Sequence, residues 1–101
     1  MPKGYWIARV DVHDTETYMK YVAANAVAFA KYHAKFLVRS GRYEAPEGPA
    51  RGRNVVIEFK DYETARACYH SPEYTDIKAL RESASQGEVL IIEGYDGSQP
   101  E

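Results

Sequence analysis

Four charged side chains stand in β-rich runs of this chain, among apolar neighbours. They are Arg9, Arg39, Glu58 and Glu93. An arginine beside a glutamate in an apolar-walled space could anchor a carboxylate or enolate and move a proton, with the carboxyl pKa tuned by desolvation. We therefore take Arg39 as the candidate anion anchor and Glu58 as the candidate proton acceptor, with Arg9 tuning Glu58.

The same four charges have a structural alternative. Cross-sheet ion pairs could fix the register of a dimer, and such networks perturb charges without catalysing anything. This is the commoner meaning of paired charges, so both interpretations stay open. A solvent-reachable cavity beside Arg39 and Glu58 would distinguish a site from a filled interface.

A second group of candidates surrounds the stretch YHSPEYTD, residues 69–76. Ser71 can cap a new helix and Pro72 suits its first position, so the stretch predicts a joint between two helices. Its flanking tyrosines could border an aromatic site, although tyrosines more often belong to the core. The candidate ligand-binding residues are Arg9, Tyr69, Tyr74, Arg81 and Glu93.

Histidine and cysteine give weaker signals. His13, His33 and His70 lie far apart and show no paired metal-ligand spacing, so we expect neither a metal site nor a cofactor. The single Cys68 lies on a helical apolar stripe, which is typical of a small buried hydrophobe, and it excludes an intramolecular disulfide.

The elements that position these residues follow from hydrophobic periodicity. Strand-like runs cover residues 4–12, 35–41, 54–59 and 88–95. Helical spacing covers residues 15–32 and, after a cap at Asp61, the region up to Gly87, broken at Ser71-Pro72. The order β-α-β-β-α-β predicts one α+β domain of the ferredoxin-like kind, residues 1–95, with a flexible tail at 96–101.

Alternation along the strands divides the predicted sheet into two faces. Residues predicted to point at the helices are Trp6, Val10, Phe36, Val38, Val55, Ile57, Phe59, Leu90 and Ile92. Residues predicted to point away are Tyr5, Ile7, Arg9, Leu37, Arg39, Val56, Glu58, Ile91 and Glu93. Because the second face mixes apolar side chains with charges of balanced sign, we expect it to meet its own copy across a twofold axis.

Composition excludes several classes of function. The net charge is −2, and the thirteen Lys and Arg residues are scattered, so no footprint for nucleic acid is visible. No window approaches 18 apolar residues, and the first residues lack a stretch of signal-peptide length, so we expect a cytoplasmic protein without membrane contact.

Several motifs resemble those of one bacterial family. RNVVIEFKDYETARACYHSPEY followed by Arg81, together with FLVRSG and EVLIIEGYD, is similar to the domain of unknown function thirteen-thirty, over about residues 4–95. The positions that match the family pattern are Arg39, Gly41, Glu47, Gly48, Arg53, Glu58, Phe59, Ala65, Tyr69, Ser71, Pro72, Tyr74 and Arg81. His33 departs from it, because such proteins usually carry a small residue there.

The resemblance implies a homodimer in which two sheets pack into a dimeric α/β barrel. Relatives in that superfamily include monooxygenases without a prosthetic group, a muconolactone-type isomerase and haem enzymes, so fold alone gives no reaction. We expect a protein that binds a small anionic or aromatic organic molecule, with proton transfer or cofactorless oxygenation as candidate chemistry. The alternative is a non-catalytic dimeric structural or accessory module.

Overall fold

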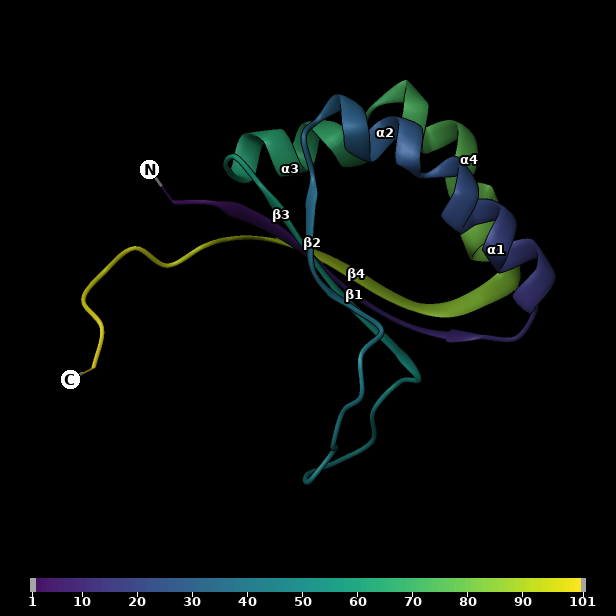
Figure 1. Cartoon of the computed structure of the whole chain (residues 1–101), viewed down its shortest axis with the longest axis horizontal. Coiled ribbons are helices and arrows are strands. Elements are labelled where there is room, and N and C mark those ends of the chain that lie inside the picture. The colour runs from purple at the N-terminus through teal and green to yellow at the C-terminus, as the bar shows by residue number, and fades with distance from the viewer. Residues whose placement is uncertain (1, 101) are drawn as a thin grey trace.

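The computed structural model describes residues 2–100 and has the predicted element order, with each helical region broken in two (Figure 1). The strands are β1 (Gly4–Val12), β2 (Lys35–Arg39), β3 (Arg53–Phe59) and β4 (Ser85–Glu93). The helices are α1 (Thr15–Ala24), α2 (Ala26–Lys31), α3 (Tyr62–Tyr69) and α4 (Pro72–Ala84). The α+β ferredoxin-like fold is therefore confirmed.

The four strands form one antiparallel sheet in the order β2-β3-β1-β4. All four helices lie on one side of this sheet, which leaves its other face uncovered (Figure 1). We call these the covered face and the uncovered face. No helix within residues 2–100 is long and apolar enough to cross a bilayer.

The core fills the space between the helices and the covered face. Its centre is Trp6, whose side chain is 1% exposed and whose indole N–H donates to the Ala65 carbonyl at 2.8 Å. The Trp6 ring lies 4.9 Å from the ring of Tyr74 and 5.2 Å from that of Phe29, both at steep angles. Edge-to-face aromatic packing of this kind fixes the helices over β1.

Side-chain caps begin the helices where the sequence predicts. Asp14 accepts from Thr17 N, and Asp61 accepts from Thr64 N. Ser71 accepts from Tyr74 N, and Pro72 occupies the first turn of α4, so the predicted joint at Ser71-Pro72 is confirmed.

Two boundaries differ from the prediction. The expected single helix to residue 32 is interrupted at Asn25, which is buried and still bonds to Tyr21 and Phe29 in the helical pattern. The last strand begins at Ser85, directly after α4, instead of residue 88, because Gly87 lets β4 run close against β1. A Cβ on Gly87 would overlap the backbone of Arg9 and Val10.

The predicted facing of two strands was wrong. In β2 the register shifts between Phe36 and Val38, so Val38 pairs with Val56 on the uncovered face and Arg39 pairs with Val55 on the covered face. Such a bulge inserts one residue and inverts the alternation after it.

In β4 the alternation is inverted throughout. Leu90 pairs with Ile7 on the uncovered face, whereas Ile91 pairs with Trp6 on the covered face. Ile92 likewise lies on the uncovered face, opposite Tyr5, and Glu93 lies opposite Gly4 on the other face.

Candidate functional site

A cavity lies between the covered face and the helices α1 and α4. Its volume is about 420 Å³ with its mouth included, but only about 30 Å³ can hold the centre of a water molecule. Its walls are mainly aromatic and aliphatic; they are lined by Trp6, Ala8, Val10, Tyr18, Tyr21, Val22, Asn25, Phe29, Phe36, Arg39, Arg53, Val55, Ile57, Tyr74, Arg81 and Val89. In this conformation the cavity admits about one water molecule, so a larger ligand must displace side chains.

Three guanidinium groups line this cavity, and among residues 2–100 no carboxylate does. Arg39 comes from β2, Arg53 from β3 and Arg81 from α4. The ion pairs found within residues 2–100 involve none of these three arginines. Arg81 is buried, Arg53 is half-buried and Arg39 is exposed at the cavity mouth. The cavity is therefore lined by positive charge without an ion-pair partner, which favours an anionic ligand.

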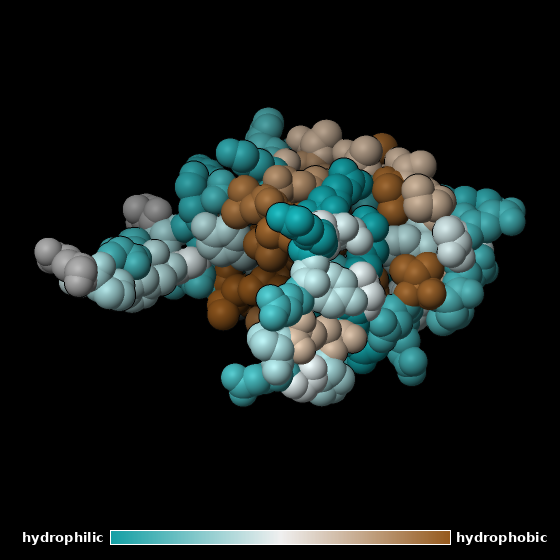
Figure 2. Space-filling view, turned by 60° about the horizontal axis from the view of Figure 1, so that its bottom comes forward, coloured by the Kyte–Doolittle hydropathy of each residue, from teal (hydrophilic) through white to brown (hydrophobic). Residues whose placement is uncertain are grey.

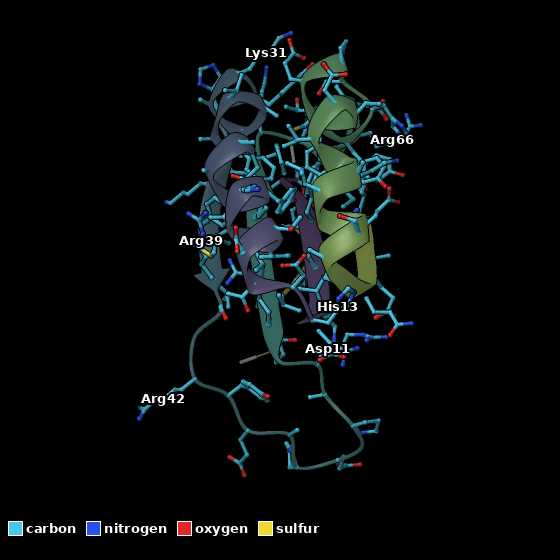
Figure 3. The ribbon with its side chains drawn as sticks, turned by 90° about the vertical axis from the view of Figure 1, so that its right-hand side faces the viewer. Asp11, His13, Lys31, Arg39, Arg42 and Arg66 are labelled. Carbon is cyan, nitrogen blue, oxygen red and sulfur yellow. The ribbon has the colours of Figure 1, made fainter. Side chains whose placement is uncertain are left out.

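The bulge in β2 places Arg39 at the cavity. The guanidinium carbon of Arg39 lies 3.9 Å from the centre of the Phe36 ring, on the covered face. Directly after it, Ser40 adopts a left-handed backbone with φ 58° and donates its N–H to Asn54 O. Figure 3 shows Arg39 on the strand beside α1, whereas Arg42 lies out on the loop. Bulges and left-handed residues commonly re-aim side chains beside functional sites.

Arg53 holds a buried donor without a partner. Within residues 2–100, Arg53 Nε is buried and forms no hydrogen bond. Its guanidinium carbon lies 5.3 Å from the centre of the Tyr18 ring, which compensates for part of the desolvation of the cation. An orphaned buried donor costs about 1–3 kcal/mol, so a bound acceptor would remove that cost.

A chain of hydroxyls crosses the cavity from α1 to α4. The hydroxyls of Tyr21 and Tyr74 lie 2.7 Å apart, and Arg81 Nε donates to the Tyr74 oxygen at 3.2 Å. Burial raises the pKa of Tyr21, and the neighbouring Tyr74 adds to this effect. Burial also raises the pKa of Tyr74, although Arg81 opposes that rise. Both hydroxyls therefore stay protonated and can donate.

The structure separates the two predicted catalytic residues. Glu58 lies on the uncovered face, where it pairs with Tyr5 and accepts from the Tyr5 hydroxyl at 3.3 Å. Arg39 lies on the covered face, so the expectation that the two share a cavity was wrong. Arg9 is also remote from Glu58, because it stands four residues beyond Tyr5 on β1, or about 13 Å along the strand.

The predicted ligand-binding residues also divide between the two faces. Tyr74 and Arg81 line the cavity, and Tyr69 packs on them from behind with its ring 5.4 Å from that of Tyr74. Arg9 lies on the uncovered face opposite Asn54 and Glu88. Glu93 is exposed at the end of β4, away from the cavity.

Sequence reasoning placed Tyr18 only on the apolar stripe of the first helix and gave Tyr21 no role. It left Arg53 open, as an anion-binding residue or, more commonly, part of an exposed charged loop. Tyr18 and Tyr21 stand one helical turn apart, and both are 6% exposed. The spacing of the two tyrosines along α1 was the available signal, but only the fold shows that they meet Arg53 and Tyr74.

The uncovered face carries an apolar row across all four strands. Val38, Val56, Ile7 and Leu90 are cross-strand neighbours in that order. Leu90 is 52% exposed and Val38 is 44% exposed. Figure 2 shows apolar side chains gathered on this side of the molecule, around the loop between β2 and β3. We call these four residues the apolar row.

The charges at one end of the uncovered face are paired. Arg51 binds Glu88 with two hydrogen bonds at 2.6 and 2.9 Å and Asp11 with one at 2.7 Å. Gly52 N also donates to Asp11, so the base of the exposed loop 40–52 is fixed to β1 and β4. This cluster matches the structural alternative for surface charges, although its members differ from those predicted.

Metal-binding side chains do not gather in this structure. Within residues 2–100, no group of three or more His, Cys, Asp or Glu side chains is arranged to hold a metal ion. Cys68 is fully buried, and burial raises the pKa of its thiol to about 12, so it stays protonated. The predicted small buried hydrophobe is confirmed.

This chain is similar to known proteins both in sequence, through one family, and in fold, through solved structures. Residues 3–95 match the family described as Domain of unknown function (DUF1330). No match was found among curated proteins.

Solved structures also resemble this chain, and three examples each cover at least 91% of it. The RPA0582 protein of unknown function from Rhodopseudomonas palustris has a TM-score of 0.77 at 12% identity, over 95% of this chain and 85% of that one. SnoaB, a cofactor-independent oxygenase from Streptomyces nogalater, has a TM-score of 0.66 at 17% identity over 100% of both chains. A dimeric ferredoxin-like protein of unknown function from Thermobifida fusca has a TM-score of 0.61 at 14% identity over 91% of both. At these identities the likeness shows the fold.

Proposed function

Because the chain belongs to the DUF1330 family, whose description names no activity, we propose from its cavity that it binds a small anionic aromatic molecule. The ligand would lie between the helices and the covered face, with its anionic group at Arg39 and Arg53. The observation that carries this proposal is the set of three arginines in an aromatic cavity that no carboxylate lines.

The energetics of buried cations support this assignment. A guanidinium taken out of water needs a counter-charge or hydrogen-bond acceptors. Arg39 has an aromatic ring, Arg53 has an aromatic ring and an orphaned Nε, and Arg81 has one tyrosine oxygen. A planar carboxylate matches the paired donors of a guanidinium, and the surrounding rings suit a flat apolar body.

Arg39 suits the role of a movable anchor. Its side chain is exposed at the cavity mouth, and it is long enough to swing outward and close again over a ligand. That movement would open the narrow cavity without unfolding the core. We assign no step in this cavity to Glu58, because it lies on the other face of the sheet.

Proton transfer and cofactorless oxygenation remain candidate chemistry for the bound molecule. SnoaB shares the fold and is a cofactor-independent oxygenase, but at 17% identity this is an analogy. In our proposal the arginines hold the carboxylate of the substrate and so fix the position of its ring in the cavity.

We further propose that the uncovered face pairs with a second copy of the chain. An apolar row flanked by charges is poorly suited to water, and a twofold contact would bury it against itself. The structural neighbour from Thermobifida fusca is described as dimeric, which agrees with this pairing.

The binding proposal can be tested with Trp6, because this single tryptophan lines the cavity. Quenching of its fluorescence by 1-naphthoate should saturate, whereas 1-naphthamide should bind far more weakly. Arg53→Gln should weaken naphthoate binding by about 10-fold or more, the value of a lost charge-assisted bond. Arg42→Gln, which changes an exposed loop residue, is the matched control.

Equal quenching by the acid and its amide, or equal affinity in Arg53→Gln and wild type, would contradict the anion site. A protein that binds neither compound but still dimerises would favour the alternative of a non-catalytic module.

Sedimentation tests the dimer separately. Leu90→Asp places a charge in the apolar row and should shift the protein to monomers, because an unpaired carboxylate resists burial. Val27→Asp is the control, since Val27 is 67% exposed on α2. A wild-type monomer, or a Leu90→Asp dimer of unchanged affinity, would contradict the pairing.

A further inference from the structure

The cavity has two polar ends that differ in chemistry. Arg39 and Arg53 stand on the neighbouring strands β2 and β3, whereas Arg81 also borders a surface hollow beside β4 with Gly87 and Val89. Arg81 itself comes from α4 and donates to Tyr74, which is bound to Tyr21 of α1. Apolar side chains such as Trp6 and Ile57 also line the cavity.

At the Arg81 end, the tyrosine hydroxyl hydrogens outnumber the acceptors available to them. Tyr21 and Tyr74 together hold two hydroxyl hydrogens, and the bond between them uses one. Arg81 Nε donates into the Tyr74 oxygen and supplies no acceptor. Whichever tyrosine donates to the other, one O–H remains, and no acceptor for it is found among residues 2–100.

The spare donor is held in place by packing. Tyr74 is fully buried, Tyr21 is 6% exposed and Arg81 is 8% exposed. The Tyr74 ring packs 4.9 Å from Trp6 and 5.4 Å from Tyr69, and Tyr21 packs against Tyr18 at 5.4 Å. A fixed O–H donor beside a buried cation is matched to an oxygen that carries negative charge.

We propose that Tyr21, Tyr74 and Arg81 form a second oxyanion-binding end, so that the ligand is a hydroxylated aromatic acid whose hydroxyl is bound as the phenolate. This rests on the proposed function, which supplies the carboxylate end at Arg39 and Arg53. The Tyr21–Tyr74 pair determines the specificity, because it holds the spare O–H and accepts the bond from Arg81.

The proposal makes the two ends separable. The carboxylate end should set affinity for any aromatic acid that fits the cavity. The hydroxyl end should add affinity only for acids that also carry a phenol, and it should favour the ionised phenol. A merely structural role for the Tyr21–Tyr74 pair predicts no such preference.

Two nitroaromatic probes test this separation with the whole protein. 4-Hydroxy-3-nitrobenzoate carries both groups, and 3-nitrobenzoate lacks the phenol; both should quench Trp6, which lines the cavity. Wild type should bind the phenol about 10-fold more tightly, as expected for an added charge-assisted bond. The visible phenolate absorption should also appear at lower pH when the probe is bound.

The variants assign the effect to residues. The double variant Tyr21→Phe/Tyr74→Phe, which removes both hydroxyls, should bring the ratio of the two affinities to about one and abolish the shift of the phenol's ionisation. Arg53→Gln should weaken both probes equally. If the double variant does not fold, Arg81→Gln should shrink the shift of the phenol's ionisation, because it removes the cation beside the two hydroxyls.

The outcomes are distinguishable. Equal binding of both probes, a phenol preference that persists in the double variant, or an ionisation shift that persists unchanged in Arg81→Gln would overturn the second end and leave the carboxylate site standing. Binding of neither probe, together with no binding of 1-naphthoate, would overturn the proposed function and this inference with it.

Discussion

The two faces of the sheet handle charge in opposite ways. On the uncovered face, Arg51 is matched by Asp11 and Glu88, and Glu58 accepts from Tyr5. On the covered face, Arg39, Arg53 and Arg81 meet tyrosines and rings but no carboxylate. Charges that serve only structure are usually paired, so the unpaired cations of the covered face support the proposed anion site there.

The largest expected effect is on the free energy of unfolding, and it should differ sharply between two adjacent residues of β1. Trp6→Ala should lower the free energy of unfolding by about 3–5 kcal/mol, because it removes the centre of the covered core. Ile7→Ala, one residue on, faces away and should cost far less in the monomer. Urea unfolding followed by circular dichroism, in the Leu90→Asp background, measures both. Similar losses for the two variants would show that the faces do not differ in packing.

A second comparison tests how closely β4 runs against β1. Gly87→Ala would drive its Cβ into the backbone of Arg9 and Val10, and overpacking of this kind costs about 1–3 kcal/mol. Gly41→Ala is the control, because its Cβ would meet no atom within 4 Å. Thermal unfolding midpoints should fall for Gly87→Ala and stay level for Gly41→Ala. An unchanged Gly87→Ala protein would contradict the close approach of β4 to β1 at this position.

Much of the fold follows from local sequence. The unbroken alternation of residues 4–12 gives β1, and the capping chemistry of Ser71 and Pro72 gives the joint between α3 and α4. These features depend only on neighbouring residues. They need no knowledge of what the segments pack against.

The candidate site is less predictable because it depends on pairing between strands. The bulge after Phe36 turns Arg39 to the covered face, and nothing in KFLVR marks that shift. The run VLII in β4 is apolar at every position, so alternation cannot choose its phase. The hydroxyl pair joins Tyr21 and Tyr74, 53 residues apart, and only tertiary structure brings them together.

The two faces should also respond to opposite ends of the pH scale. Hydrogen bonding from Gly52 N and from Arg51 lowers the pKa of Asp11, and Arg51 lowers the pKa of Glu88. Their stabilisation is present above the ordinary pKa values of 3.8 and 4.5 and is lost as the pH falls through the lower folded values. Arg51→Gln should therefore flatten the acid limb of a plot of stability against pH.

The loss of stability at high pH, the alkaline limb of the same plot, should come from the covered face. Burial raises the pKa of Tyr21 and Tyr74 above the ordinary value of 10.0, so their stabilisation is present below pH 10 and is lost as the pH rises above it. Tyr21→Phe should flatten this limb and leave the acid limb unchanged, as measured by urea midpoints across the pH range. A change of the alkaline limb in Arg51→Gln, or of the acid limb in Tyr21→Phe, would contradict this division of charge between the faces.

The smallest expected effect involves a residue on neither face. His33 follows α2 with φ 56°, a left-handed conformation that helices usually end with glycine. Ala34 N donates to Phe29 O across this turn, so the conformation is part of the helix end. His33→Gly should raise the free energy of unfolding by about 1 kcal/mol, because glycine adopts positive φ without a Cβ penalty. His33→Ala, which keeps the Cβ, should not. Since neither variant touches the cavity or the apolar row, naphthoate binding and dimerisation should stay at wild-type values. A change in either would show that these assays report general stability and would weaken every comparison between the two faces.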